Sequence, residues 1–292
     1  MKIIRFMGGL GNQLFQYAYY RKMQQADQET FADLTAYERQ SFHYGLELES
    51  VFGVELSTAR LQDIRRLGYT FSPGDRLRRK FLPRKKTFYS EKVIGFDQEL
   101  ENLTQKDAYL EGYWHSHRYF YPVQEQLQKE LRCRRELSAR SAGAVRQIRD
   151  SNAAAVHIRR KDFLDPKNSF LVNLSETEYY TQALKKLQEA MGEVVLYVFS
   201  DDMEWAREHI FLKNNVYVDW NRGEESWQDM ILMSYCRSAV IANSTFSWWG
   251  AWLNPLGLKK YVVCPGKWYS VAAVGGRKVR TEDLVLPGWE TV

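Results

Sequence analysis

The sequence predicts an α/β protein built from two Rossmann-like domains. From Asn152 onward, short apolar runs alternate with helical patterns, as in a parallel sheet that is covered by helices on both faces. The chain also opens with a strand at 2–6, a glycine turn and a helix, which is the start of a second such unit. With 292 residues the chain is long enough for two domains, which we place at 1–150 and 151–292.

The expected elements of the C-terminal half follow one another at short intervals. Strands are expected at 153–158, 194–199, 216–218, 239–242 and 261–264. Helices are expected at 175–191, 202–210, 225–235 and 245–254. The first of these helices opens with Ser175-x-x-Glu178, the pattern of a capping box.

The N-terminal half is less regular. Strands are expected at 30–33 and 107–114, and helical segments at 57–67, 117–131 and 137–150. Pro73, Gly74 and Pro83 interrupt the basic stretch 76–88, which predicts an irregular excursion there.

Composition and charge narrow the class of protein. A hydrophobic content of 45% and a charged content of 26% are typical of a globular protein. The three cysteines stand at no metal-like spacing, so neither a disulfide framework nor a zinc site is expected. No signal-like segment and no run of about 18 apolar residues is present, which predicts a cytoplasmic protein.

The basic stretch 76–88 interleaves cations with leucine and phenylalanine. Such a segment could contact the anionic inner face of the cell membrane, which would make the protein peripheral there, or a nucleic acid. A solvated loop is the commoner explanation of this pattern.

The strand predicted at 153–158 runs directly into Arg159 and Arg160. In open α/β sheets, ligands bind at the carboxyl edge of the strands. A guanidinium offers a planar set of donors that matches phosphate oxygens, so two adjacent arginines could anchor a diphosphate. A solvated strand terminus fits the local pattern equally well.

Two further strand ends carry polar side chains, Asp201-Asp202 and Asn243-Ser244-Thr245-Phe246. If the sheet is parallel, these ends lie on the same edge as the arginines and form one site. The second begins a helix, whose free N–H groups suit a phosphate, although plain capping by Ser244 or Asn243 is compatible with the pattern. The aspartates could cap a helix, or could accept from the N1–H and the amine of guanine.

The glycine turn Gly8-Gly9-Leu10-Gly11-Asn12-Gln13 does not match the dinucleotide fingerprint G-x-G-x-x-G. On local pattern alone, Asn12 and Gln13 fit a helix cap.

Three segments together resemble a known enzyme family. His157-x-Arg159-Arg160-x-Asp162 resembles the H-x-R-R-x-D motif of α1,2/α1,6-fucosyltransferases. Residues 8–18 and 243–252 resemble segments of the bacterial α1,2-fucosyltransferases, glycosyltransferase family 11, in the same order along the chain. The resemblance therefore spans nearly the full length.

The resemblance implies a GT-B-like fold, with two Rossmann-like domains facing across a cleft. It implies an N-terminal acceptor-side domain and a C-terminal domain that binds GDP-fucose. The implied reaction transfers fucose with inversion to the 2-hydroxyl of a galactose-terminated oligosaccharide or glycolipid, in surface glycan or lipopolysaccharide O-antigen synthesis. Because arginines are available to neutralise the diphosphate, we expect no metal and no other cofactor.

The resemblance also assigns roles to residues. Arg159 is expected to stabilise the leaving diphosphate, and Asn12 and Asp162 are further catalytic candidates. Arg160 is expected to brace the loop or to contact Asp162. The predicted nucleotide-sugar contacts are Gly11, Gln13, His157, Arg160, Asp201, Asn243, Ser244, Thr245 and Phe246.

Several alternatives stay open at this stage. The general base is not identified: Asp162 and Asp165 are candidates, and a dissociative mechanism would need little base catalysis. A fucosyltransferase of another linkage, or another GDP-sugar transferase, would carry the same core motifs. A nucleotide-binding or nucleic-acid-binding module without catalysis is the non-enzymatic alternative, although no basic helix or stacking motif accompanies the basic stretch.

Overall fold

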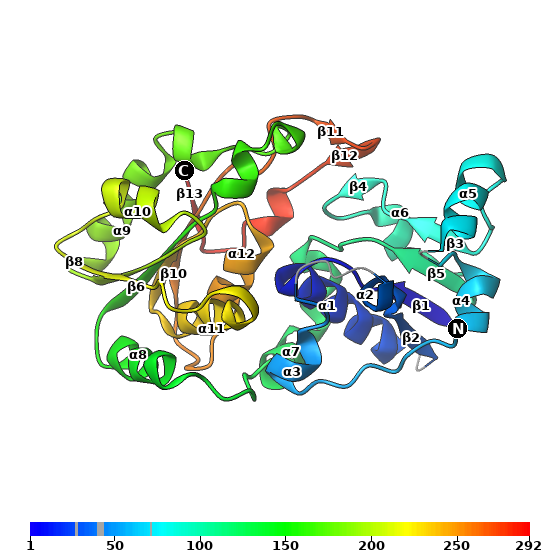
Figure 1. The fold of residues 1–292 in the computed structure, drawn as a ribbon, viewed down its shortest axis with the longest axis horizontal. Coiled ribbons are helices and arrows are strands. Elements are labelled where there is room, and N and C mark those ends of the chain that lie inside the picture. The colour runs from blue at the N-terminus through cyan, green and yellow to red at the C-terminus, as the bar shows by residue number, and fades with distance from the viewer. Residues whose placement is uncertain (27–28, 40–43, 71) are drawn as a thin grey trace. The chain divides into compact units, whose positions relative to one another are not determined.

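The computed structural model describes residues 1–26, 29–39, 44–70 and 72–292, which form two compact units (Figure 1). The first unit comprises Met1–Arg134 and Gly275–Asp283, and the second comprises Arg135–Val274 and Leu284–Val292. The boundary that we placed at 150 therefore falls after a helix of the second unit. The sequence pattern also gave no sign that the chain returns to the first unit near its end.

The second unit contains a six-stranded sheet in the order β13-β10-β9-β6-β7-β8. Every neighbouring pair of its strands is parallel, and Ile158 at the end of β6 lies beside Ser200 at the end of β7. The bounds are β6 (Ala153–Ile158), β7 (Val195–Ser200), β8 (Asn214–Tyr217), β9 (Ser238–Val240), β10 (Tyr261–Cys264) and β13 (Glu290–Thr291). Of these strands, only the short edge strand β13 was not expected.

Helices cover both faces of this sheet. Figure 1 shows α8 and α11 on one side of the strands and α9 and α10 on the other. The bounds are α8 (Ala139–Arg149), α9 (Tyr179–Met191), α10 (Met203–His209), α11 (Trp227–Tyr235) and α12 (Thr245–Trp252). Short 3-10 helices connect them: η3 (Lys161–Leu164), η4 (Pro166–Asn168), η5 (Leu174–Glu176) and η6 (Gly223–Glu225). The predicted parallel α/β domain is confirmed.

The core of the second unit explains these elements. All six residues of β6 are buried, and Ala154, Val156 and Ile158 pack with apolar side chains of β7 and α9 in one cluster. A strand that is covered on both faces needs apolar residues at nearly every position, which is why 153–158, apolar except at His157, could be recognised as a strand.

The start of α9 corrects one expectation. The predicted capping box at Ser175 and Glu178 is wrong, because α9 begins only at Tyr179 and Glu178 makes no capping hydrogen bond. Instead, Asn173 accepts from the N–H of Ser175 and stabilises η5. The hydroxyl of Thr177 then accepts from the N–H of Tyr179 at 3.2 Å. A competing side-chain turn thus moves the helix start by four residues.

A partly buried lysine joins two helix ends in this unit. Lys260 donates from Nζ to the carbonyl oxygen of Ser234 at 2.6 Å, in the last turn of α11, and to that of Leu253 at 2.8 Å, just after α12. A cation is favourable at these positions because the last carbonyls of a helix have no partner within it and carry partial negative charge.

The first unit contains a four-stranded parallel sheet in the order β2-β1-β5-β3. Its strands are β1 (Lys2–Arg5), β2 (Thr30–Asp33), β3 (Phe88–Ser90) and β5 (Ala108–Glu111). A separate pair, β4 (Val93–Ile94) and β12 (Arg277–Val279), is also parallel, and it ties the returning segment to this unit. The helices are α1 (Leu10–Ala26), α2 (Thr35–Arg39), α3 (Leu48–Phe52), α4 (Leu61–Leu67), α5 (Pro73–Phe81), α6 (Gln98–Glu101) and α7 (Gln124–Glu130). The short elements η1 (His117–Tyr119), η2 (Tyr121–Val123), β11 (Ala273–Val274) and η7 (Glu282–Leu284) complete the chain.

The irregular excursion that we expected in the basic stretch is wrong for its first part, because α5 occupies 73–81. Pro73 stands at the first turn of the helix, where its missing N–H costs nothing, and Ser72 caps the helix by accepting from the N–H of Asp75 at 3.2 Å. The expected helix at 117–131 is likewise replaced by η1, η2 and α7, with Pro122 in the first turn of η2.

Candidate active site

The three polar strand ends are neighbours in the sheet of the second unit. β6 lies between β7 and β9. From β6 the chain proceeds through β7 to β8 on one side, and later fills β9 and β10 on the other side. The strand order therefore reverses between β6 and β9, and in open α/β sheets ligands bind outside the carboxyl ends at such a point.

Arg159 follows β6 directly and contacts two carboxylates. Its Nη2 forms an ion pair with Asp162, and its Nη1 lies 3.3 Å from Oδ2 of Asp201. The side chain is 34% exposed, so one part of the guanidinium remains accessible to solvent. The expected contact of Arg160 with Asp162 is wrong. Because η3 turns the chain immediately after the arginines, the carboxylate three residues on faces Arg159 instead.

Arg160 braces the loop, which was the other role expected for it. Its Nη1 donates to Oδ2 of Asp202 at 2.6 Å, and its backbone N–H donates to Oδ1 of Asp201 at 2.9 Å. Its guanidinium also lies 5.6 Å from the ring centre of Trp205 in α10. Burial opposes the charge on Asp202, but the hydrogen bond from Arg160 keeps its pKa below the ordinary value. Asp202 also caps α10.

His157 is buried at the end of β6, and its ring lies 5.8 Å from that of Phe246, centre to centre. Burial, and then the charge of Arg159, lowers the pKa of His157 to about 3. The imidazole is therefore neutral at neutral pH, and it can donate or accept a hydrogen bond without adding charge.

Asn243 and Ser244 form the third strand end. The amide nitrogen of Asn243 donates to the carbonyl oxygens of Val172 at 2.9 Å and Trp268 at 3.0 Å, which ties two loops to the site. Ser244 caps α12 by accepting from the N–H of Phe246 at 3.3 Å, and Thr245 is the first residue of that helix. The capping interpretation is thus confirmed, and the positive end of the helix dipole still points to this edge.

Buried polar atoms without a hydrogen-bond partner gather at these strand ends. In the described part of the chain, four of the nine such side-chain atoms lie here. They are His157 Nδ1, Arg160 Nε, Asn243 Oδ1 and Asp201 Oδ2, of which the last is in an ion pair with Arg159 but accepts no hydrogen bond. Native proteins leave few buried polar atoms unpaired, because each costs free energy, so such a cluster indicates a place where a polar ligand binds.

The predicted residues of the first unit lie at its glycine turn. Gly8 has a φ of 83°, and a Cβ there would lie 2.7 Å from the amide nitrogen of Asn12. Asn12 Oδ1 lies 2.9 Å from Nε2 of His115, a contact that sequence reasoning missed because 103 residues separate the two.

Gly11 and Gln13 are buried near the start of α1. The amide nitrogen of Gln13 donates to the carbonyl oxygens of Gly8 and Gly45, and its oxygen accepts from the N–H of Glu47. Gln13 thus holds the turn in place. Its predicted contact with a nucleotide sugar, like that of Gly11, stays a prediction.

Within residues 1–26, 29–39, 44–70 and 72–292, no group of three or more His, Cys, Asp or Glu side chains is arranged to hold a metal ion. The expectation that no metal is needed remains a prediction. None of the helices that the structure describes is long and apolar enough to cross a membrane.

Residues 48–291 match the model of the family described as Glycosyl transferase family 11. The chain belongs to this family. It is a glycosyltransferase, as the motifs predicted.

Relatives in this family include two proteins from Escherichia coli. One is an alpha-1,2-colitosyltransferase, 29% identical over 279 residues, which cover 91% of this chain and 92% of that protein. The other is the O-antigen biosynthesis glycosyltransferase WbnK, 42% identical over 123 residues, which cover 41% of this chain and 40% of that protein. Human galactoside alpha-(1,2)-fucosyltransferase 1 is 25% identical over 167 residues, 53% of this chain and 46% of that protein.

The fold is also similar to a solved structure, that of NodZ alpha-1,6-fucosyltransferase co-crystallized with GDP. The TM-score is 0.51 at 15% sequence identity, covering 87% of this chain and 92% of that one. The GT-B-like fold class is confirmed.

Proposed function

We propose that this protein transfers fucose from GDP-fucose to the 2-hydroxyl of a galactose residue, with inversion and without a metal, during surface glycan or O-antigen assembly. The observation that carries the proposal is the cluster of buried polar atoms without a hydrogen-bond partner at the strand ends of the second unit. Membership of glycosyltransferase family 11 and the names of the relatives support the choice of reaction.

The diphosphate of the donor fits the edge formed by β6 and β9. Arg159 offers a guanidinium that is partly open to solvent, and the start of α12 offers backbone N–H groups beside Ser244 and Thr245. As the glycosidic bond breaks, negative charge grows on the bridging oxygen of the leaving GDP. A fixed cation at that oxygen lowers the barrier because it stabilises the charge only as it develops.

The base of the nucleotide fits the side of the edge formed by β6 and β7. Oδ1 of Asp201 is held by the backbone N–H of Arg160, whereas Oδ2 makes no hydrogen bond and is held only by the ion pair with Arg159 at 3.3 Å. A carboxylate fixed in this way can accept from the N1–H and the exocyclic amine of guanine, which adenine and uracil do not offer together. This arrangement favours a guanine nucleotide.

The two carboxylates considered as general base both have structural partners. Asp162 is paired with Arg159, and Asp165 caps η4 by accepting from the N–H of Lys167 at 2.9 Å. We therefore assign neither as the base, and the dissociative route remains the simpler mechanism for this chain.

A second candidate donor is GDP-colitose. It is favoured by the relative named as an alpha-1,2-colitosyltransferase, which aligns with 91% of the chain. Colitose is fucose without the 3-hydroxyl, so a site that hydrogen-bonds this hydroxyl would reject colitose strongly, whereas a site lined by apolar atoms would not reject fucose to the same extent.

The test is transfer from labelled GDP-fucose and GDP-colitose to a panel of galactose-terminated acceptors, with excess EDTA and with the product linkage determined. We expect an α1,2-linked fucosyl product and a lower kcat/KM with GDP-colitose. GDP binding without transfer from either donor to any acceptor would overturn the proposal. A higher kcat/KM with GDP-colitose would replace the donor and keep the reaction class.

A further inference from the structure

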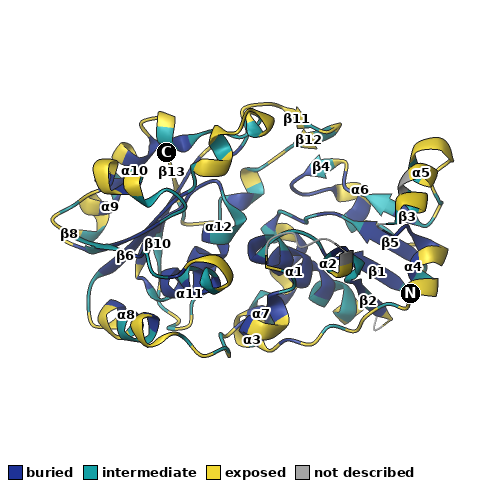
Figure 2. Ribbon diagram, in the orientation of Figure 1, coloured by how far each residue is buried: buried dark blue, intermediate teal, exposed yellow. Residues whose placement is uncertain are grey.

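Helix α5 of the first unit exposes large apolar side chains. Leu77 is 61% exposed, Phe81 is 68% exposed, and Leu82, which follows the helix, is 54% exposed. They are three of the nine large apolar side chains exposed in the described part of the chain, and they lie within six consecutive positions. Figure 2 shows α5 largely in the colour of exposed residues.

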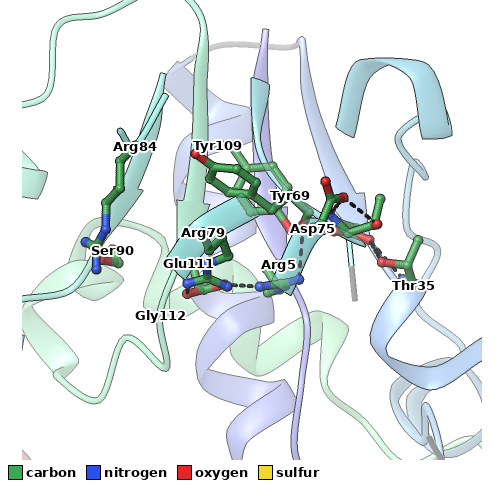
Figure 3. A network of polar contacts seen from close by, with 12 residues as sticks. Arg5, Thr35, Tyr69, Asp75, Arg79, Arg84, Ser90, Tyr109, Glu111 and Gly112 are labelled. Atoms are coloured by element: carbon green, nitrogen blue, oxygen red, sulfur yellow. Dashed lines mark hydrogen bonds and ion pairs between the residues drawn. The ribbon is translucent and has the colours of Figure 1, made fainter. Parts of the chain in front are cut away.

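Polar rather than apolar side chains attach α5 to the rest of its unit. Arg79 Nη2 donates to Oε1 of Glu111 at 2.7 Å, and its guanidinium lies 5.0 Å from the ring centre of Phe88 (Figure 3). Near the start of the helix, the carboxylate of Asp75 accepts from the backbone N–H of Thr70 at 2.7 Å. These contacts fix which side of the helix faces the protein.

The apolar side chains lie on the opposite side. Asp75 and Arg79 are four residues apart and share one face of the helix, and Leu77 and Phe81 share a face displaced by two residues, which is about 200° of rotation. None of the described side chains of α5 is buried. The helix is therefore amphipathic in the reverse of the usual sense, with its apolar face turned to solvent.

Cations surround this apolar face. Arg78, Lys80, Arg84 and Lys86 are all exposed. None of the four forms an ion pair with a carboxylate in the ranges that the structure describes. An exposed surface that combines leucine and phenylalanine with cations outside ion pairs is complementary to a partner with an apolar interior and an anionic surface.

We propose that residues 77–86, here called the docking surface, bind the protein to a lipid bilayer that contains anionic lipids. Leu77, Phe81 and Leu82 insert among the acyl chains at the interface, and the cations contact the lipid phosphates. A nucleic acid fits less well, because phosphate contacts would use the cations and leave the three apolar side chains in water. This proposal does not depend on the sugar that the enzyme transfers.

The test is co-sedimentation of the full chain with vesicles of phosphatidylcholine alone and of phosphatidylcholine mixed with phosphatidylglycerol. We expect binding to the mixed vesicles, little binding to the neutral ones, and a loss of binding at high salt, because exposed charges are screened. Two double variants test the apolar and the electrostatic contributions separately. Leu77→Ser with Phe81→Ser removes apolar side chains, and Lys80→Glu with Lys86→Glu reverses two charges. Each should weaken vesicle binding at least roughly tenfold.

The matched control variants carry substitutions in the second unit. Phe211→Ser removes an apolar side chain that is 64% exposed. Lys185→Glu with Lys213→Glu changes the net charge by the same amount as the lysine pair of the docking surface, at side chains that are each 77% exposed. Circular dichroism checks that every variant is folded, and donor hydrolysis or transfer by the serine variant in free solution should equal that of the wild type.

Absence of binding to the mixed vesicles at low salt would overturn the proposal. So would binding that either docking-surface variant retains in full, or that the control variants lose to the same degree. An oligonucleotide that competes fully with the vesicles, and still binds the serine variant, would favour the nucleic-acid alternative instead.

Discussion

Replacing Arg159 with alanine tests whether its guanidinium stabilises the leaving group. A full charge at about 4 Å, with an effective dielectric constant of about 20, interacts with a unit charge by roughly 4 kcal/mol. If about half a charge develops on the bridging oxygen, the loss is about 2 kcal/mol, or roughly 30-fold in rate. Removing a preorganised donor from an oxyanion site costs about 10²–10³-fold, so we expect a loss on the order of 10²-fold in turnover.

The neighbouring arginine supplies the contrast. Arg160 is bound to Asp202, with the two side chains 24% and 17% exposed, and it braces the start of α10. Its replacement by alanine should lower the free energy of unfolding by about 1–3 kcal/mol, because a partly buried carboxylate loses its partner. Turnover of the folded fraction should change less than it does for Arg159→Ala.

The assay combines steady-state transfer, GDP binding by calorimetry and urea unfolding. Arg207→Ala is the matched control, because Arg207 forms an ion pair with Asp219 at 2.7 Å and lies 48% exposed in the same unit. Arg159→Lys should recover only part of the activity, since it restores the charge without the planar fork. If Arg159→Ala stays within about threefold of the wild type while Arg160→Ala loses turnover, Arg159 does not stabilise the leaving group.

Three further predictions concern titratable groups that are buried or partly buried. The folded-state pKa of His157 is about 3, below the unfolded value of 6.5, so the stability that it contributes is present above pH 6.5 and is lost as the pH falls below it. Urea unfolding of the wild type and of His157→Phe checks this. From pH 7 to pH 5, the free energy of unfolding of the wild type should fall by about 2 kcal/mol more than that of the variant. Parallel pH profiles of the two free energies would contradict the prediction. Lys260→Met should lower the free energy of unfolding by about 2–4 kcal/mol, because the carbonyl oxygens at the ends of α11 and α12 lose their donor; an unchanged unfolding midpoint would show that these bonds contribute little. Glu91, whose pKa burial raises to about 8, accepts from the backbone N–H groups of Tyr113 at 2.6 Å and Trp114 at 3.0 Å. Above pH 8, where Glu91 is mainly ionised and both oxygens accept, Glu91→Gln should destabilise the first unit by about 1–3 kcal/mol, since the amide turns a donor toward one of the two N–H groups, and hydrogen exchange of both should quicken.

The parallel sheet, and the edge at which its polar strand ends gather, could be predicted from the sequence. β6 was predicted with its observed bounds because a strand buried on both faces is apolar at nearly every position, here at all but His157, and the polar residues on either side mark its ends. The polar residues after β6, β7 and β9 could be assigned to one edge because parallel strands all end on the same side of a sheet. These conclusions depend on local pattern and on a general rule of topology.

The tertiary structure alone decided which partner each of these side chains takes. The carboxylate of Asp162 faces Arg159 rather than Arg160, and this follows from the turn of η3, which no periodicity predicts. His115 meets Asn12 because β1 and β5 are neighbours in the sheet, although 103 residues separate the two side chains. The return of β12 to the first unit likewise depends on pairing with β4.

The same distinction explains the error at α5. From the local sequence, the prolines were interpreted as helix breakers. In the structure, the cap by Ser72 and the hydrogen bond from Arg79 to Glu111 stabilise a helix there. Propensity acts through neighbours in the sequence, and a short helix is fixed chiefly by the tertiary contacts of one face. Only the folded chain shows which face of α5 makes these contacts. It therefore also shows that Leu77 and Phe81 are exposed to solvent.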